Sequence, residues 1–322
     1  MAKATREAYG EALEKMGGLC SNIVVLDADL SKSTKTCIFA KSYPERFFNV
    51  GIAEQNLAGV AAGLAAAGKI PFISTFAMFA SGRAYEQIRN SICYPKLNVK
   101  IAATHAGLTV GEDGASHQSI EDISLMRSIP NMTVLVPADG NETCQAIQFA
   151  AEYDGPVYIR LGRMAVPDLF TEEYRFEHGK AVCLVEGTDA TIAATGIMVH
   201  IAKEAAEKLQ AEGFSIRVLN IHTIKPIDKD AIVKAAEQTG AIVTCEEHSI
   251  IGGLSSAVAE VLVENLPVPM ERVGVRDTFG ESGIPKELLK KYGLTVDDVV
   301  LAVKKVIARK HRLRSYEKKG EL

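Results

Sequence analysis

Short apolar runs alternate with segments of helical periodicity through the whole chain. Strands that are buried on both faces are predicted at residues 23–27, 72–75, 99–103, 133–136 and 157–160. Helices are predicted between them, with Thr5 as a possible cap of the first, at residues 4–17, 53–67, 79–94, 119–128 and 140–152. This alternation predicts an α/β fold with an open, mostly parallel sheet, whose ligands lie beyond the carboxyl ends of the strands.

A second α/β series follows a polar segment at residues 163–180. Its predicted strands are at 190–195, 215–221, 241–245 and 273–275, and its predicted helices are at 198–212, 228–239, 253–264 and 296–310. We therefore predict two open α/β domains, residues 1–168 and 187–322, joined by a linker at 169–186. Residues 270–283 are rich in charge and glycine but carry no readable motif, and we interpret them as scaffold.

The composition excludes several classes of protein. The chain has 322 residues, 47% of them hydrophobic, which is enough for two domains with their own cores. A net charge of −4 and a mixed cluster at 304–314 do not predict a nucleic-acid or membrane surface. No bilayer-spanning run and no signal peptide are expected. Six scattered cysteines without a C-x-x-C pair favour reduced thiols in a cytoplasmic protein.

Residues 48–56 form the most informative segment. Glu54 is the only acid between Glu45 and Glu86, and it opens a helix of apolar and small residues that we expect to be buried nearly all round. A carboxylate at the start of such a helix is costly unless it has a defined partner. Either Glu54 caps the first turn, or it is kept protonated so that it can work as an acid.

Residues 111–118, Gly-Glu-Asp-Gly-Ala-Ser-His-Gln, place two acids and a histidine in a glycine-bracketed loop. His117 can donate or accept a proton near neutral pH. Alternatively, Ser116 or His117 caps the helix that is predicted to begin near residue 119. No metal-ligand spacing accompanies the loop, so no metal site is predicted in this chain.

Aromatic and basic residues also gather near the predicted strand ends. Phe76 and Phe79 follow one strand, and the pair is either part of the core or a face on which a flat ring stacks. Arginine and histidine side chains suit a phosphate group. The residues that could converge on one anion are His105, Arg160, Arg6 and Ser33.

Three motifs, in this order and at this spacing, resemble the pyrimidine-binding domain of transketolase. They are residues 48–55, residues 74–79, and His105 followed by residues 111–118. The resemblance continues through residues 129–132 and 155–160, and residues 224–228 and 277–283 are similar to the transketolase C-terminal domain. It covers nearly the whole chain and implies the same two domains.

The resemblance implies a role for the residues near the cofactor, thiamine diphosphate. Glu54 matches the glutamate that hydrogen-bonds N1′ of the aminopyrimidine and thereby favours the imino tautomer that takes the C2 proton. Phe76 matches the ring that stacks on the aminopyrimidine, and Phe79 is expected to line the same pocket. Asp29 matches an acid near the cofactor.

The resemblance also implies a substrate site. His117, which we expect to be catalytic together with Glu54, and Asp113 match groups that contact the hydroxyls of the donor sugar. The set that binds the sugar phosphate matches His105, Arg160, Arg6 and Ser33.

One family feature is missing from this chain. Thiamine diphosphate enzymes of this kind hold the diphosphate through Mg²⁺ with a Gly-Asp-Gly motif, and this sequence has none. The resemblance therefore implies the C-terminal section of a split transketolase, a transferase of pentose phosphate chemistry. The Mg²⁺ ligands would come from an N-terminal-section subunit in an α2β2 assembly. Together the chains would move a two-carbon ketol group from a ketose phosphate to an aldose phosphate.

Position 82 departs from the family pattern, because Gly82 stands where the family often has a further aromatic residue. The sequence of residues 82–87 more closely resembles two related families, deoxyxylulose-phosphate synthase and the beta subunit of 2-oxo acid dehydrogenases. Related enzymes acting on another phosphorylated sugar or on pyruvate, and a non-catalytic partner that kept the fold, are therefore alternatives. The loop at 111–118 and the phosphate set favour transketolase, with the sugar pair left open.

Overall fold

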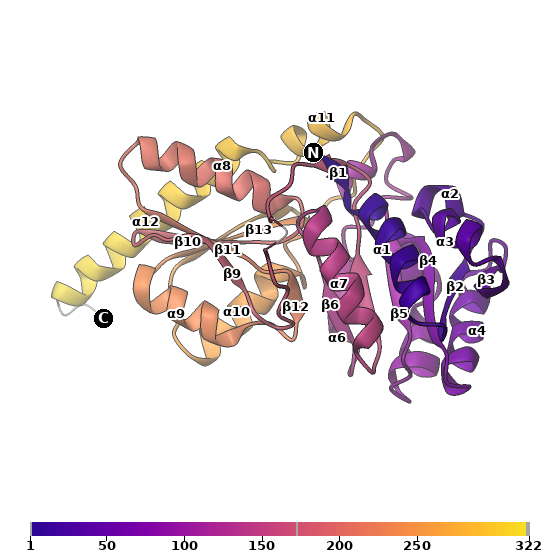
Figure 1. Cartoon of the computed structure of the whole chain (residues 1–322). Helices are drawn as coiled ribbons and strands as arrows, with labels where there is room; N and C mark the ends of the chain where they lie inside the picture. Colours follow the sequence, from indigo (N-terminus) through magenta and orange to yellow (C-terminus); the bar gives the residue numbers. More distant parts are fainter. Residues whose placement is uncertain (1, 172, 320–322) are drawn as a thin grey trace.

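The computed structural model describes residues 2–171 and 173–319. Glu172, in the predicted linker, and residues 320–322, at the end of the second predicted domain, lie outside the described residues. Two large sheets form the scaffold, one built mainly from each half of the chain (Figure 1). No helix within the described ranges is long and apolar enough to cross a membrane.

The first sheet has seven strands in the order β12-β6-β7-β5-β4-β2-β3. These strands are β2 (Ile23–Asp27), β3 (Phe47–Asn49), β4 (Ile70–Phe76), β5 (Lys100–Thr104), β6 (Thr133–Leu135), β7 (Val157–Arg160) and β12 (Thr223–Lys225). Neighbouring strands are parallel except for β12, which runs antiparallel to β6. The predicted fold class, an open and mostly parallel α/β sheet, is confirmed.

Helices cover both faces of this sheet, because successive side chains of a strand point to opposite sides. Ile23 and Val25 of β2 share a buried cluster with α1 (Thr5–Leu19), α3 (Cys37–Ser42) and α7 (Gly140–Glu152). Val24 and Leu26 belong to another cluster with α4 (Glu54–Ala66) and α6 (Asp122–Ser128).

The shorter elements are β1 (Lys3–Ala4) paired with β8 (Ala165–Val166), α2 (Ser31–Thr34), α5 (Tyr85–Gln87), 3₁₀ turns η1 (Pro44–Arg46) and η4 (Leu108–Asp113), and π-helical turns η2 (Phe79–Arg83) and η3 (Ile88–Cys93).

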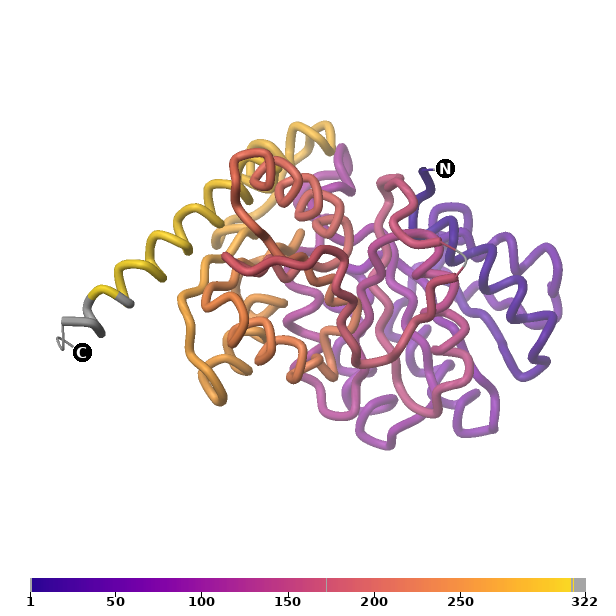
Figure 2. Tube along the Cα trace, turned by 60° about the vertical axis from the view of Figure 1, so that its left-hand side comes forward, coloured from indigo at the N-terminus to yellow at the C-terminus, as the bar shows by residue number. Residues whose placement is uncertain are grey.

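The second sheet has five strands in the order β14-β13-β10-β11-β9, and only β9 is antiparallel to its neighbour. The strands are β9 (Val182–Val185), β10 (Ala190–Ala194), β11 (Ile216–Asn220), β13 (Ile242–Ser249) and β14 (Met270–Val275). The helices are α8 (Met198–Ala211), α9 (Lys229–Thr239), α10 (Leu254–Glu264), α11 (Pro285–Lys291) and α12 (Val296–Lys319). The later turns of α12 point away from the rest of the chain (Figure 2). β9 lies inside the segment predicted as a linker.

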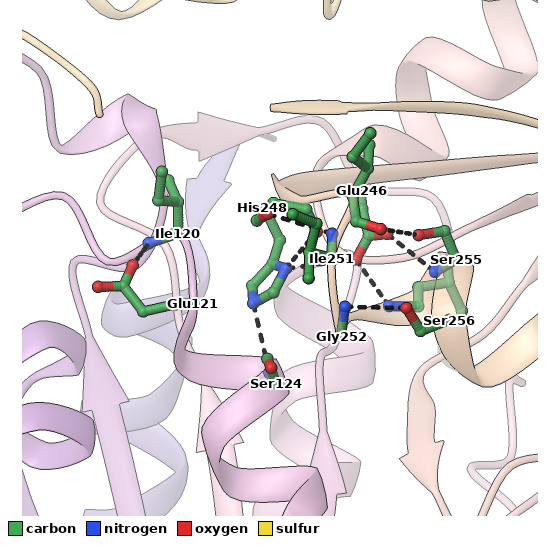
Figure 3. Close-up of polar contacts among 12 residues, drawn as sticks. Ile120, Glu121, Ser124, Glu246, His248, Ile251, Gly252, Ser255 and Ser256 are labelled. Carbon is green, nitrogen blue, oxygen red and sulfur yellow. Dashed lines mark hydrogen bonds and ion pairs between the residues drawn. The ribbon is translucent and has the colours of Figure 1, made fainter. Parts of the chain in front are cut away.

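The end of β13 joins the two halves of the chain (Figure 3). His248 Nε2 accepts a hydrogen bond from the backbone N–H of Ser124 in α6, at 3.3 Å. Two residues earlier, the buried Glu246 accepts from the backbone N–H groups of Leu254 and Ser255 at 2.7 and 2.8 Å, which satisfies donors at the start of α10. The contact of His248 thereby holds the second half against α6.

Several local predictions are wrong. The segment predicted as a helix at 79–94 is helical over 79–83 and 85–93, but as two π-helical turns on either side of α5 and not as one α-helix. Thr5 is the first residue of α1 and does not cap it, because its Oγ1 accepts a hydrogen bond from Gly162 N at 2.7 Å. The helix predicted near 119 begins at Asp122 with Glu121 at its N-cap position, so neither Ser116 nor His117 caps it.

Burial of α4 also differs from the prediction. Leu57, Ala58 and Ala61 are buried against the sheet. Gly59 and Gly63 face open space, because a methyl group added at either position would meet nothing within 4 Å. Only one face of this helix is therefore buried within the single chain.

Candidate functional site

Loops that follow three adjacent parallel strands meet at one edge of the first sheet. The register pairs Asp27 of β2 with Ser74 of β4, and Phe76 of β4 with Thr104 of β5. The strands therefore end side by side, and His105 and Phe79 come immediately after them. The sheet brings together residues far apart in sequence at its carboxyl edge, as predicted.

An aromatic cluster forms at this edge. The Phe76 ring stacks on the His105 ring with centroids 3.9 Å apart, and on Phe79 with centroids 5.6 Å apart. The His117 ring meets Phe79 edge-on at 5.2 Å. Phe76 is buried and Phe79 is half-buried, so one side of the cluster belongs to the core and the other faces the site. Two of the three sequence motifs, residues 74–79 and His105 with residues 111–118, thus meet in one cluster.

Glu54 lies at the first position of α4 and is only 5% exposed. Its carboxylate does not cap the helix, because α4 has no side-chain cap and the partner of Glu54 is Arg83, whose Nη1 lies 3.0 Å from Oε1. The guanidinium carbon of Arg83 lies 4.0 Å from the centre of the Phe79 ring. A cavity of about 420 Å³, lined by Glu54, Arg83 and residues 52–56, opens in front of this acid.

His105 is neutral in this environment. Burial, and then the positive charges of Arg6 and Arg163, lower its pKa to about 3. Arg6 Nη1 lies 3.0 Å from His105 Nε2, and since a guanidinium can only donate, Nε2 accepts. The ring proton is therefore on Nδ1, which donates to Thr104 Oγ1 at 2.9 Å. The lowered pKa also reflects that several cations gather around one ring.

Arg160 is the last residue of β7 and Arg163 follows in the next loop, and the two have different surroundings. Arg160 is buried, its Nε is 2.9 Å from the fully buried Asp122 carboxylate, and its Nη2 donates to the carbonyl of Glu247 at 2.9 Å. Arg163, three residues later, is 36% exposed and lies 3.7 Å from the carboxylate of Asp113. Arg160 thus ties the two halves together, whereas Arg163 lies beside Asp113 and its charge acts on His105.

The loop carrying Asp113 and His117 is fixed by the second half of the chain. Gln118 Nε2 donates to the carbonyls of Leu108, Gly111 and Glu281, at 3.2, 3.1 and 2.9 Å. Ser282 Oγ donates to the carbonyl of Glu112 at 2.6 Å. These contacts agree with the interpretation of residues 270–283 as scaffold.

Asp29 and Ser33 lie on the loop after β2. Asp29 is exposed, adopts a left-handed conformation with φ of 65°, and accepts a hydrogen bond from Asn49 Nδ2 at 2.9 Å. The backbone carbonyl of Ser33 accepts from Arg6 Nη1 at 3.1 Å. Arg6 therefore connects Ser33 to His105, whereas Asp29 is held by Asn49 and makes no contact with the cluster among the described residues.

The family models match both halves of the chain. The transketolase pyrimidine-binding domain matches residues 1–168, and the transketolase C-terminal domain matches residues 179–299. The chain belongs to the transketolase family. The family predicted from the three sequence motifs is thereby confirmed.

Relatives of similar length are described as a section or a subunit of a transketolase. A transketolase C-terminal section of Methanocaldococcus jannaschii is 54% identical, covering 92% of this chain and 94% of its own length. The 6-deoxy-6-sulfo-D-fructose transketolase subunit of a Clostridium species is 47% identical, covering 95% of each. A solved split-gene transketolase, described as an inactive β4 tetramer, has a TM-score of 0.90 and 62% identity, covering 95% of this chain and 99% of that one.

Two residues that contact the predicted site residues, Arg163 and Arg83, were not predicted from the sequence. A residue in the loop after a fully buried strand, such as Arg163, is better placed to meet a ligand than one inside the strand, such as Arg160. Arg83 carried no signal in the sequence, because its position over Phe79 depends on the π-helical turn.

Proposed function

We propose that the chain is one subunit of a two-chain transketolase that transfers a two-carbon ketol group between phosphorylated sugars. One observation carries this proposal. A buried acid, Glu54, faces a cavity beside a stacked aromatic pair, and His117 meets the same pair edge-on. A flat heterocycle that needs both a ring face and a hydrogen-bonding acid suits that arrangement.

The residues present fit the aminopyrimidine end of thiamine diphosphate. When bound, the cofactor supplies the nucleophilic carbon that accepts the ketol group. Glu54 would hold a proton at the ring nitrogen, since its carboxylate is shielded from water and lies at the start of a helix. The Phe76 and Phe79 rings would fix the plane of the heterocycle, and Asp29 would lie near the same group.

The substrate would lie on the side of the cluster that holds His117 and Asp113. Both side chains would contact hydroxyl groups of the donor sugar, and His117 would exchange a proton with the reacting oxygen. The anionic end of the sugar would bind near His105, where Arg6 and Arg163 supply positive charge, with Ser33 beside them. Arg163 takes the role that was predicted for Arg160.

An N-terminal-section subunit would complete the site. It would supply the Mg²⁺ ligands, because this sequence has no Gly-Asp-Gly motif. Two copies of each chain would form an α2β2 enzyme. We also propose the division into domains at 1–168 and 187–322 with a linker at 169–186, and a cytoplasmic location, which suits six free cysteines.

The anion could be a sulfonate instead of a phosphate. The Clostridium relative acts, by its name, on a 6-deoxy-6-sulfo sugar, and it is 47% identical to this chain. A guanidinium pair near a neutral histidine can bind either group. The dehydrogenase-like alternative has no comparable support, since pyruvate has no distal anion for Arg6 and Arg163.

Steady-state kinetics with the assembled complex test the proposal. The donor would be xylulose 5-phosphate or 6-deoxy-6-sulfo-D-fructose, the acceptor an aldose phosphate, with thiamine diphosphate and Mg²⁺ present. We expect ketol transfer from at least one donor and no release of carbon dioxide from pyruvate. Turnover of pyruvate without ketol transfer would contradict the proposal.

A further inference from the structure

Arg83 occupies the place that the proposed function assigns to the aminopyrimidine. Its guanidinium lies over the Phe79 ring at 4.0 Å, and its Nη1 is 3.0 Å from Glu54 Oε1. A ring face and an acid are also the two groups that the heterocycle needs. The same face of Phe79 cannot stack on both partners at once, and both would donate to Glu54.

The guanidinium resembles the heterocycle in its chemistry. It is planar, stacks on aromatic rings and carries N–H donors in its plane, so it satisfies the same acid in the same way. Glu54 is only 5% exposed, and a carboxylate shielded to that degree is costly without a partner. Arg83 provides that partner while the pocket holds no heterocycle.

The fold makes this contact easy to break. Arg83 ends the π-helical turn η2 and its side chain is 52% exposed, so it can turn into solvent without repacking the core. The neighbouring Gly82 leaves no bulky side chain beside it. Solvent screens the exposed guanidinium, and a heterocycle that donates to Glu54 in its place leaves no buried charge unpaired.

We propose that Arg83 is a placeholder that pairs with Glu54 and covers Phe79 until the aminopyrimidine displaces it. The inference rests on the proposed function, because it takes Glu54 and Phe79 as the groups that bind the cofactor. Arg83 thereby competes with the cofactor and sets the concentration at which the site fills. It keeps the buried acid satisfied in a subunit that has not yet met its cofactor.

Calorimetric titration of thiamine diphosphate, with Mg²⁺, into the assembled wild-type and variant complexes tests this. In Arg83→Met the cofactor no longer displaces an ion pair and a stacked cation, so its Kd should fall by about 3- to 30-fold. Arg83→Lys keeps the charge but loses the planar stack, so its Kd should fall less. Arg89→Met is the matched control, because Arg89 is an exposed arginine of the same segment whose side chain contacts the neighbouring Asn90.

Tighter binding in Arg83→Met with no change in Arg89→Met would support the placeholder. An unchanged or higher Kd in both Arg83 variants would overturn it, and so would an equal gain in Arg89→Met, which would indicate a general effect of charge. Failure of the proposed function looks different: the wild-type complex would then bind no thiamine diphosphate at all.

Discussion

Replacing Arg163 and Arg160 by methionine separates the two roles that the structure gives these arginines. Arg163 is 36% exposed, its nearest acids lie at 3.6 and 3.7 Å, and it also donates to the carbonyl of Val110, so its loss should change the free energy of unfolding by about 1–2 kcal/mol. A charge-assisted hydrogen bond to a substrate anion is worth about 1.5–3 kcal/mol. Arg163→Met should therefore lower kcat/KM by about 10- to 150-fold.

The Arg160 variant should fail in the opposite way. Asp122 is fully buried, and removing Arg160 leaves its charge without the guanidinium that pairs with it at 2.9 Å. Breaking a buried pair from one side costs about 3–5 kcal/mol, which urea unfolding of the chain can measure. A double variant, Arg160→Met with Asp122→Leu, should recover much of that loss because no buried charge is left.

A sugar donor without its distal anion provides the control. The loss in kcat/KM for Arg163→Met should appear mainly in KM, because the anion lies far from the reacting carbon, and it should vanish with the uncharged donor. If Arg163→Met left kcat/KM unchanged while Arg160→Met raised KM without loss of stability, the assignment of the two arginines would be wrong.

Three further predictions concern single residues. Glu54→Gln should leave the urea midpoint nearly unchanged and lower kcat by about 10²- to 10⁴-fold, and near-wild-type turnover would rule out a proton role for this acid. Folding lowers the pKa of His105 from 6.5 to about 3, so between those two pH values the unfolded chain binds more protons than the folded chain. The free energy of unfolding should therefore fall as the pH falls through this range, by up to about 1.4 kcal/mol per pH unit. His105→Gln should flatten this slope, and equal slopes would refute the reasoning. Gly107 has a φ of 83°, and a methyl group added there would overlap the Glu247 carboxylate. Gly107→Ala should therefore lose about 1–3 kcal/mol of stability in urea unfolding. Gly63→Ala is the control, because its methyl group would lie in open space and should cost no stability.

The strands of the first sheet were predictable because burial on both faces leaves a plain signal. The run Ile23 to Asp27 is apolar up to its last residue, and β2 has those same bounds. By contrast, β12 joins the first sheet although it follows β11 in sequence, and its three residues carry no period that assigns them to either half. Pairing between distant segments was the part of the fold that local patterns did not reveal.

The residues of the candidate site also fall into those that the sequence predicts and those that it does not. The motifs around Glu54, Phe76 and His117 could be found in the sequence because each combines a rare residue type with an unusual setting. The position of Arg83 over Phe79 could not be found, since a π-helical turn has no reliable sequence pattern. Arg160 and Arg163 could not be told apart from the sequence, since one ends β7 and the other follows it closely, and only the structure shows that Arg160 is held by the buried Asp122.

Reconstitution tests the central claim most directly. The purified chain, a co-expressed N-terminal section, and the mixture of both would be assayed for ketol transfer with thiamine diphosphate and Mg²⁺ present. The split-transketolase account predicts turnover in the mixture alone, with this chain supplying Glu54 and the aromatic cluster. Turnover by the isolated chain would contradict it, because the Mg²⁺ ligands would then have to lie within this sequence.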